Sequence, residues 1–500
     1  MSKELFHQNA LFVYNTLSRQ KELFIPLHAP FVGMYVCGPT VYSEPHLGNC
    51  RTFVSFDMIY RYLKHLGYKV RYVRNITDAG HIENSAGVSD DRISAQAKLE
   101  HVEPMEIVQK YSVAFHRVME IFNALPPDIE PTATGHIIEQ IEMTKEILAS
   151  GFAYEKEGSI YFDVEKFAKE FPYTKLSGRN LDDLLNNTRD LGGQELKQGR
   201  LDFALWIKAK PEHAMQWPSP WGKGYPGWHI ECSAMSTKYL GETFDIHGGG
   251  MDLIPTHHTN EIAQSIACNH VDPVKYWLHT NMLTVNGQKM SKSLGNSFLP
   301  HELFTGTHPL LNRGYSPMTV RFFMLQAHYS STLDFTNEAL NAAEKGYKRL
   351  MQSEKNVQAL QAGNTIDNNS ENACNKFLTD VYTGMNNDFN TAQAIASLNE
   401  ISAYINTWYH TAEKKAPILP NTLIRLKETF QTFIFDILGL KHEEDGNSAL
   451  MQNVMELVIE LRKDARIRKD FAASDKIRDT LKEIGIQLKD SKEGTTWNVD

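Results

Sequence analysis

Residues 31–76 restrict the fold most, because a short strand, a turn, an amphipathic helix and a second strand follow one another there. Residues 31–36 (FVGMYV) are apolar and rich in strand formers, and a glycine and two prolines follow them. Apolar residues then recur at helical spacing from 46 to 66, and residues 69–76 (KVRYVRNI) alternate like a strand. A strand–helix–strand unit predicts a parallel sheet covered by helices, the α/β class.

The same kind of pattern returns after residue 225. A strand expected at 243–247 leads into three glycines, a helix is expected at 257–268, and a strand at 277–285 precedes the loop 286–296. The two halves predict one Rossmann-like parallel sheet that is split by the intervening residues. Further helices are expected at 92–122, 136–150, 337–362, 371–385, 390–412, 420–438, 449–468 and 473–484.

These patterns predict five segments. They are the first half of a Rossmann-like catalytic domain (1–124), a connective insertion (125–225), the second catalytic half (226–316), an α-helical bundle (317–441) and a small C-terminal domain (442–500). The insertion is mixed in pattern, and a polar stretch, HEEDGN, opens the last segment.

Charge and cysteine usage narrow the function. Lysine and arginine number 51 against 60 acidic residues, a net charge of −9, yet residues 461–492 hold ten basic and six acidic residues. Such a chain does not coat nucleic acid non-specifically, although its basic segment can bind it. Five widely spaced cysteines indicate no disulfide framework. The sequence has neither an apolar run of about 18 residues nor an apolar N-terminal signal, so a cytoplasmic protein with no membrane partner is expected.

Two short strings suit phosphate binding. His46-Leu47-Gly48-Asn49 stands where the first helix begins; a helix start offers free N–H groups to an anion, and His46 can donate to a phosphoryl oxygen. Lys289-Met290-Ser291-Lys292-Ser293 lies behind the last expected strand, and its two lysines can follow a moving oxyanion. Alone, the first string can equally be a capped helix start, and the second is more simply a solvated basic loop.

Four scattered residues could hold a metal. Cys37 ends the first strand, Cys232 lies in a Gly-Trp-His-Ile-Glu-Cys string, and His257 and Glu261 are four apart on one expected helix face. Two sulfurs, an imidazole and a carboxylate can form a tetrahedral zinc site. His258 and Glu261 also share a face, so the spacing leaves the choice of histidine open. Taken alone, an unligated pair of buried cysteines is the simpler interpretation.

Together and in this order, the two phosphate-binding strings resemble the paired signatures of class I aminoacyl-tRNA synthetases. Longer blocks look like those of cysteinyl-tRNA synthetases over nearly the whole chain: GMYVCGPTVY from residue 33, PGWHIECSAM from 226, FDIHGGGMD from 244, and the C-terminal GTTW. The chain departs from the family pattern at Asn49, which replaces a second histidine, and at Thr256 and Thr259 beside the paired histidines.

The resemblance implies a set of site residues. One zinc ion per chain would be held by Cys37, Cys232, His257 and Glu261. Adenylate formation would use His46, Asn49, Lys289 and Lys292, and the site for ATP with Mg²⁺ would also include Gly38, Gly48 and Asp252. The pocket for the cysteine side chain would include Thr77, Trp228 and His229. The tRNA anticodon would be contacted by Arg466, Asp475, Asp490 and Trp497.

The resemblance also implies the reaction. L-cysteine and ATP would form cysteinyl-adenylate, and the cysteinyl group would pass to the 3′ end of tRNA(Cys), with a monomer as the acting species. Serine is nearly isosteric with cysteine, so zinc, which prefers sulfur and drives thiol deprotonation, would select the substrate without an editing domain. Two alternatives remain: a ligase that joins cysteine to an amino-sugar and lacks the C-terminal domain, and a non-catalytic tRNA- or zinc-binding relative.

Overall fold

The computed structural model describes residues 5–80, 92–181, 197–211, 213–443, 446–468, 470–483, 486–491 and 494–499. The chain divides into two compact units, Met1–Lys441 and His442–Asp500. The finer segment boundaries expected from the sequence, at 124/125, 225/226 and 316/317, stay predictions.

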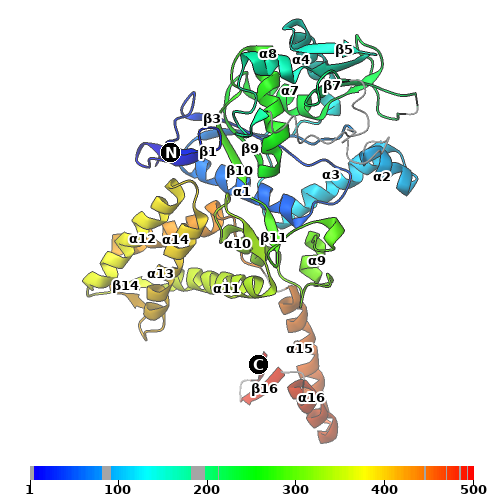
Figure 1. Ribbon diagram of the computed structural model, residues 1–500. Coiled ribbons are helices and arrows are strands. Elements are labelled where there is room, and N and C mark those ends of the chain that lie inside the picture. The colour runs from blue at the N-terminus through cyan, green and yellow to red at the C-terminus, as the bar shows by residue number, and fades with distance from the viewer. Residues whose placement is uncertain are drawn as a thin grey trace. The chain divides into compact units, whose positions relative to one another are not determined.

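A four-stranded parallel sheet in the order β10-β9-β3-β4 forms the centre of the first unit (Figure 1). Its strands are β3 (Phe31–Val36), β4 (Lys69–Arg74), β9 (Phe244–Gly250) and β10 (Val274–Thr280). Met34 of β3 stands opposite Tyr72 of β4 on one side and Ile246 of β9 on the other. The pairing of β3 with β9 confirms that two distant parts of the chain build one parallel sheet.

Helix α1 (Leu47–His65) connects β3 to β4 and contacts β4, β9 and β10 of the sheet. Its apolar residues at helical spacing, among them Phe56, Ile59 and Leu63, are buried without measurable exposure. Gly248 on β9 allows the close approach, since a Cβ there would lie 2.2 Å from the Phe56 ring. The apolar residues that recur at helical spacing in the sequence therefore form the face of α1 that packs on the sheet.

The segment expected to be an insertion folds largely as a second, antiparallel sheet. Its order is β5-β6-β7-β8, with β5 (Ala153–Lys156), β6 (Ser159–Phe162), β7 (Phe203–Lys208) and β8 (Gly224–Pro226). Figure 1 shows this sheet near α4, α7 and α8. Those helices, with the short α5, are α4 (Ile137–Ala149), α5 (Val164–Glu170), α7 (Trp228–Leu240) and α8 (Thr259–Asn269), and a 3-10 turn, η2 (Thr134–His136), precedes α4.

A third, small sheet carries the lysine-containing loop. It consists of β11 (Leu283–Val285), β12 (Gln288–Lys289) and β13 (Leu333–Phe335). The single strand expected at 277–285 is therefore wrong in extent, because the chain leaves the central sheet after Thr280 and enters a different one at Leu283. Between these strands, Arg51 donates to the carbonyls of Asn281 and Met282, and the Met282 carbonyl also accepts from the Leu333 N–H of β13 at 3.4 Å.

The helix expected at 92–122 is two helices, α2 (Arg92–Glu100) and α3 (Pro104–Ile121). Pro104 has no N–H to donate and stands at the start of α3, where none is needed. The backbone N–H of Glu103 donates to Glu106 Oε1 at 3.2 Å, so the break is also capped. The apolar periodicity carried through this break and concealed it in the sequence.

Helices dominate the rest of the first unit, as expected. They are α9 (Pro300–Thr305), α10 (Pro317–Leu325), α11 (Asn337–Ala359), α12 (Asn368–Asn386), α13 (Thr391–Tyr409) and α14 (Pro420–Gln431), which continues as a π-helical turn, η6 (Thr432–Ile437). Smaller elements are η1 (Leu5–His7), β1 (Phe12–Asn15), β2 (Gln20–Leu23), η3 (Met251–Leu253), η4 (Ile254–His258), η5 (Lys292–Leu294), β14 (Gln361–Ala362) and β15 (Lys415–Ala416).

A buried ionic network joins α1 to α10. The Asp57 carboxylate accepts hydrogen bonds from Arg61 Nε at 2.9 Å, Arg321 Nη2 at 2.5 Å and the Leu125 N–H at 2.7 Å. Asp57 is 2 % exposed and Arg321 is fully buried. The carboxylate thus neutralises charge that neither arginine could carry alone in this setting.

The second unit contains a helix pair and a hairpin. The helices are α15 (Gly446–Ile467) and α16 (Phe471–Glu483), and the antiparallel strands are β16 (Ile486–Ser491) and β17 (Gly494–Val499). The helix pair was expected, whereas the hairpin was missed because most residues of its strands are polar. No described helix of either unit is long and apolar enough to cross a membrane.

Candidate functional site

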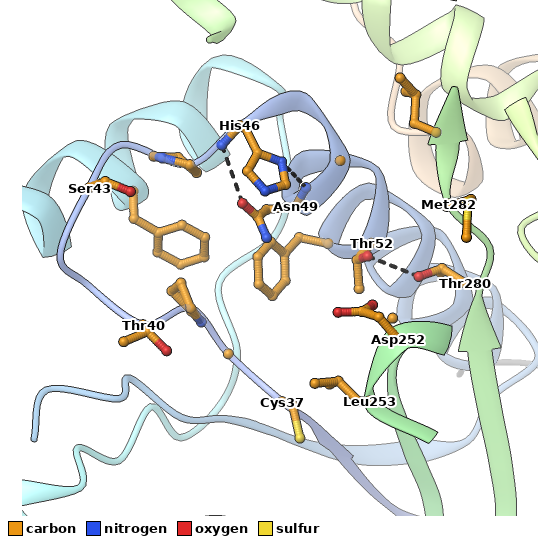
Figure 2. A pocket seen from close by; sticks show the side chains of 18 of the residues that line it. Cys37, Thr40, Ser43, His46, Asn49, Thr52, Asp252, Leu253, Thr280 and Met282 are labelled. Atoms are coloured by element: carbon orange, nitrogen blue, oxygen red, sulfur yellow. Dashed lines mark hydrogen bonds between the residues drawn. The ribbon is translucent and has the colours of Figure 1, made fainter. Parts of the chain in front are cut away.

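The start of α1 is fixed by a reciprocal cap between two predicted site residues (Figure 2). The Asn49 N–H donates to His46 Nδ1 at 3.3 Å, and the His46 N–H donates to Asn49 Oδ1 at 3.3 Å. An amide at position 49 can accept this second bond at the helix start. Asn49 in place of a histidine therefore preserves a well-formed helix N-terminus.

A pocket of about 560 Å³ opens at the carboxyl ends of β3, β9 and β10. In α/β sheets this edge, beside the point where the strand order reverses, is the usual ligand-binding site. The sequence-predicted residues that line it are Cys37, Gly38, His46, Gly48, Asn49, Trp228, Asp252 and Lys289. The structure thus brings residues from four separate parts of the sequence to one cavity.

The lysine-containing loop reaches this pocket from β12. Lys289 and Met290 line the cavity, and a Cβ on Gly48 would lie 3.0 Å from Met290 Cε. The Asn296 side chain holds the loop by accepting from the Ser291 N–H at 2.8 Å and donating to the Lys289 carbonyl at 3.2 Å. The side chain of Lys292 lies outside the described residues.

The four predicted metal ligands lie together in a buried cluster. Cys37 Sγ is 3.7 Å from Cys232 Sγ and 3.7 Å from Glu261 Oε1, and His257 Nε2 is 3.1 Å from Glu261 Oε1. A tetrahedral zinc ion with Zn–S bonds of about 2.3 Å places its two sulfurs about 3.8 Å apart. The observed spacing and the Cys₂HisGlu donor set therefore fit zinc.

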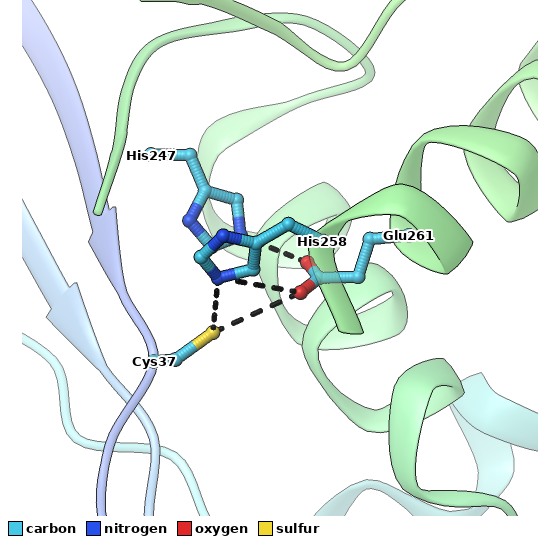
Figure 3. A group of neighbouring side chains, drawn as sticks. All are labelled: Cys37, His247, His258 and Glu261. Atoms are coloured by element: carbon cyan, nitrogen blue, oxygen red, sulfur yellow. Dashed lines mark hydrogen bonds and ion pairs between the residues drawn. The ribbon is translucent and has the colours of Figure 1, made fainter. Parts of the chain in front are cut away.

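A second set of potential ligands overlaps the first (Figure 3). It consists of Cys37, His247, His258 and Glu261, and in each set the ligand atoms lie within 4.8 Å of one another. His258 Nε2 is 3.3 Å from Cys37 Sγ but 4.0 Å from Glu261 Oε1, and His247 Nε2 is 2.8 Å from Glu261 Oε2. Only the set with His257 supplies two sulfurs, the ligands that most favour zinc over harder divalent ions.

The two histidines reach this cluster because the chain before α8 is a π-helical turn, Ile254–His258. His257 Nε2 and His258 Nε2 both approach Glu261 Oε1, at 3.1 and 4.0 Å. The helix expected over 257–268 therefore begins later as a regular α-helix, at Thr259, after this turn.

Burial disfavours the charged forms of the cysteine and histidine side chains in this cluster when no cation is bound. It raises the pKa of the Cys37 thiol well above its usual value, and the adjacent Cys232 adds to this; burial also raises the pKa of Cys232. The pKa of His258 is lowered well below its usual value by burial. A divalent ion reverses the effect on the thiols and binds neutral imidazole, so the site matches the needs of a metal.

A line of histidines behind the cluster was not predicted from the sequence. His258 Nδ1 is 2.8 Å from His279 Nε2, and His279 Nδ1 is 2.8 Å from Thr16 Oγ1. Burial lowers the pKa of His279 to about 3, so its ring is neutral and links His258 to Thr16 through its two nitrogens. Since His279 and Thr16 stand 263 residues apart, no local pattern could reveal them.

The predicted substrate-pocket residues take different places. Trp228 lines the pocket with its ring centroid 4.4 Å from that of His257. His229 stands behind it, with Nδ1 2.9 Å from His257 Nδ1. Thr77 is buried, and its hydroxyl donates to Glu231 Oε2 at 2.9 Å. Trp228 is thus the one of the three that the described structure places at the cavity wall.

The predicted anticodon residues all belong to the second unit. Arg466 is exposed on α15, and Asp475 is exposed on α16 with an ion pair to Arg478 at 3.1 Å. Trp497 pairs with Leu488 across the hairpin and packs half-buried against the small core of this unit. Asp490 lies in β16, and its side chain is outside the described residues.

Comparison with known proteins decides the family. A family model described as the tRNA synthetases class I (C) catalytic domain matches residues 23–345, and a DALR domain model matches residues 380–442. A cysteine–tRNA ligase from Phocaeicola vulgatus is 55% identical over 496 residues, covering 99% of this chain and 100% of its own length. The chain belongs to the cysteine–tRNA ligase family. This membership confirms the family resemblance found in the sequence.

Other cysteine–tRNA ligases and solved structures agree with this placement. The cysteine–tRNA ligase of Deinococcus radiodurans is 45% identical over 496 residues, covering 97% of this chain and 96% of its own length. A methionyl-tRNA synthetase from Mycobacterium tuberculosis, bound by methionyl-adenylate, superposes with a TM-score of 0.57 at 14% identity, covering 82% of this chain and 92% of its own. At that identity the likeness concerns the fold, which is the expected α/β class.

Proposed function

We propose that this chain is a cysteine–tRNA ligase that activates L-cysteine with ATP and esterifies tRNA(Cys) with it. The observation that carries the proposal is the buried cluster of Cys37, Cys232, His257 and Glu261, because Cys37 also lines the pocket that His46 borders. A thiol-binding metal beside a phosphate-binding helix start suits a substrate with both a sulfur and an activated carboxylate. The full-length family match favours this function over the two alternatives.

We assign the cluster to one zinc ion held by Cys37, Cys232, His257 and Glu261. Zinc would supply a soft Lewis acid that favours the substrate thiolate over a serine hydroxyl. Trp228, at the cavity wall against His257, would exclude water from the substrate side chain. Thr77 and His229 would act from behind this wall by orienting Glu231 and His257.

Adenylate formation would take place between the α1 start and the lysine loop. The substrate carboxylate attacks the α-phosphorus of ATP, supplied with Mg²⁺, and pyrophosphate leaves. The backbone N–H of Gly48 and the His46 ring would stabilise the phosphoryl oxygens, Asn49 would hold the helix start that presents them, and Lys289 and Lys292 would neutralise the leaving group. Asp252, which lines the same pocket, would accept from the ribose hydroxyls, and the backbone at Gly38 would form part of the pocket wall.

Transfer to tRNA would use the second unit for recognition. Five basic residues between 462 and 469, of which Arg462, Lys463 and Arg466 lie in α15, make a segment suited to phosphates. Our candidates for anticodon contacts remain Arg466, Asp475, Asp490 and Trp497. A cytoplasmic monomer is the acting species in this proposal.

The test is cysteine-dependent ATP–pyrophosphate exchange, with zinc measured on the same sample and serine assayed in parallel. We expect exchange with cysteine alone and one zinc per chain. Cys232→Ser should lose both, whereas the matched control Cys374→Ser, at a fully buried cysteine of α12 outside the cluster, should keep both. Cysteine-independent exchange, or a zinc-loaded Cys232→Ser variant, would contradict the assignment. Charging of tRNA(Cys) then tests the second step.

A further inference from the structure

Arg51 is a buried arginine of α1 that the proposed chemistry does not use. It lies five residues after the His46 cap, is 1 % exposed, and no described carboxylate lies within ion-pair distance of it. Burial lowers its pKa to about 10, because the charged form is disfavoured away from water. The groups that the guanidinium binds must therefore offset the cost of burying its charge.

The guanidinium binds two chain segments at once. Arg51 Nη1 donates to the carbonyls of Asn281 at 3.0 Å and Met282 at 2.8 Å, and Nη2 donates to those of His328, at 3.3 Å, and Ser331. The planar fork suits this arrangement, because its donors are fixed in direction. Arg51 therefore ties α1 to the exits of β10 and α10 with a single side chain.

Both segments lead directly to the lysine-containing loop. Asn281 and Met282 line the pocket and pass into β11, which pairs with β12, the strand that ends at Lys289. Residues 328–331 pass into β13, which pairs with β11. Asp334 of β13 also accepts from Thr284 Oγ1 at 2.6 Å and from the Gly287 N–H at 2.8 Å. A displacement at 281–282 would thus move the whole hairpin.

One of these segments also contacts the helical bundle. His328 Nε2 is 2.7 Å from the Asp388 carbonyl, and Asp388 Oδ1 accepts from the Tyr329 hydroxyl at 2.8 Å and the Tyr14 N–H at 2.8 Å. Asp388, between α12 and α13, is 2 % exposed and has a φ of 64°. The loop that Arg51 holds is therefore anchored from the bundle side as well.

We propose that Arg51 is a positioning residue for adenylate formation: it fixes the β11–β12 hairpin, and with it Lys289, relative to the helix start that carries His46. The inference rests on the proposed function. A helix start and a loop that act on opposite ends of one triphosphate must keep a constant separation, and a misplacement of about 1 Å can cost about 100-fold in rate.

The variants are Arg51→Lys, which keeps the charge but loses the fork, and Arg51→Gln, which keeps two N–H donors without the charge. Arg321→Lys is the control for loss of a buried guanidinium, because Arg321 is equally buried and donates to the Leu438 and Phe122 carbonyls at 2.8 Å, away from the loop, in addition to its ion pair with Asp57. The measurements are kcat and KM in cysteine-dependent pyrophosphate exchange, normalised to active sites by titration of the adenylate formed.

We expect both Arg51 variants to lower kcat per active site by about 100-fold, with the KM for cysteine within about twofold of the parent. In a double-mutant cycle, Arg51→Lys should add little to Lys289→Ala, because both remove the same contact. Four results would overturn the proposal and leave Arg51 a structural residue. In the first two, the losses in the double-mutant cycle are additive, or the loss is explained by fewer active sites. In the other two, Arg321→Lys loses as much activity, or both Arg51 variants fail to fold while Arg321→Lys folds.

A second measurement separates this proposal from the proposed function. Amide hydrogen exchange of residues 283–290 should accelerate about tenfold in Arg51→Lys, while residues 52–65 stay protected as in the parent. The hydrogen-exchange pattern reports on the hairpin even if the parent protein shows no cysteine-dependent activity. Absence of that activity would refute the ligase assignment but not the positioning role of Arg51. Unchanged protection of 283–290 would overturn the positioning role.

Discussion

Replacement of Gly38 by alanine tests how closely the metal site depends on backbone packing. Gly38 follows Cys37 at the end of β3, and its N–H donates to Asn75 Oδ1 at 2.9 Å. A Cβ at this position would lie 1.6 Å from the Asn75 carbonyl oxygen, so the two backbones must separate by at least 1.4 Å to reach a distance of 3.0 Å. The family resemblance gave Gly38 a place in the ATP site, and the structure adds this contact between strand ends.

That displacement is large compared with what the cluster tolerates. Cys37 is the next residue, and Asn75 Oδ1 lies 3.7 Å from Cys232 Sγ, so both sulfurs would shift. Metal–ligand distances hold within about 0.2 Å. We therefore expect Gly38→Ala to fall well below one zinc per chain and to lose about 100-fold or more in kcat/KM for cysteine-dependent exchange.

The matched control is Gly33→Ala on the same strand. A Cβ at Gly33 would lie 3.3 Å from Phe244 Cβ, a tight contact that relaxes with a shift of a few tenths of an ångström. We expect this variant to keep its zinc and at least half of the parent activity. The measurements are zinc per chain and exchange kinetics on the same samples. A Gly38→Ala protein with one zinc and parental kinetics would refute the reasoning.

Three further predictions concern the same elements. His257→Ala should lose zinc, whereas His258→Ala should retain one zinc with affinity reduced by about 10- to 100-fold, both read from competition with a chelating dye. Asp57→Ala removes the carboxylate that pairs with two buried arginines and should lower the free energy of unfolding by about 3–5 kcal/mol in denaturant titration. The control Asp272→Ala, at an exposed ion pair, should change the free energy of unfolding by less than about 1 kcal/mol. Asn49→Ala removes one half of the α1 cap and should cost about 1 kcal/mol of stability by the same titration.

The sequence predicted best what local patterns determine. The β3–α1–β4 unit is confirmed nearly to the residue, because apolar periodicity and the glycine after α1 define both its faces and its ends. The strand at 277–285 was wrong in extent because the break depends on Arg51, which lies about 230 residues away along the chain. Periodicity carries no information about such a partner.

The candidate site was predictable in its residue types but not in its arrangement. The spacing of His257, His258 and Glu261 allowed two registers, and only the π-helical turn before α8 shows that both rings approach the carboxylate. His279 and Thr16 were missed because each is an ordinary polar residue in its own segment. Their relevance arises from the parallel alignment of β10 beside β9 and from the N-terminal hairpin.

The distance along the chain between the two cysteines has a consequence for biosynthesis. Cys37 and Cys232 stand 195 residues apart, and Glu261 stands 224 residues beyond Cys37. A ribosome adding about 5–20 residues per second needs about 11 to 45 s to add the 224 residues from Cys37 to Glu261. For most of this time, β3 can pair with β4, but its other edge has no β9 to receive it. The nascent chain would therefore carry an open strand edge together with a proposed zinc ligand that has no partners, and the arrival of β9, α7 and α8 would complete both at the same stage of translation.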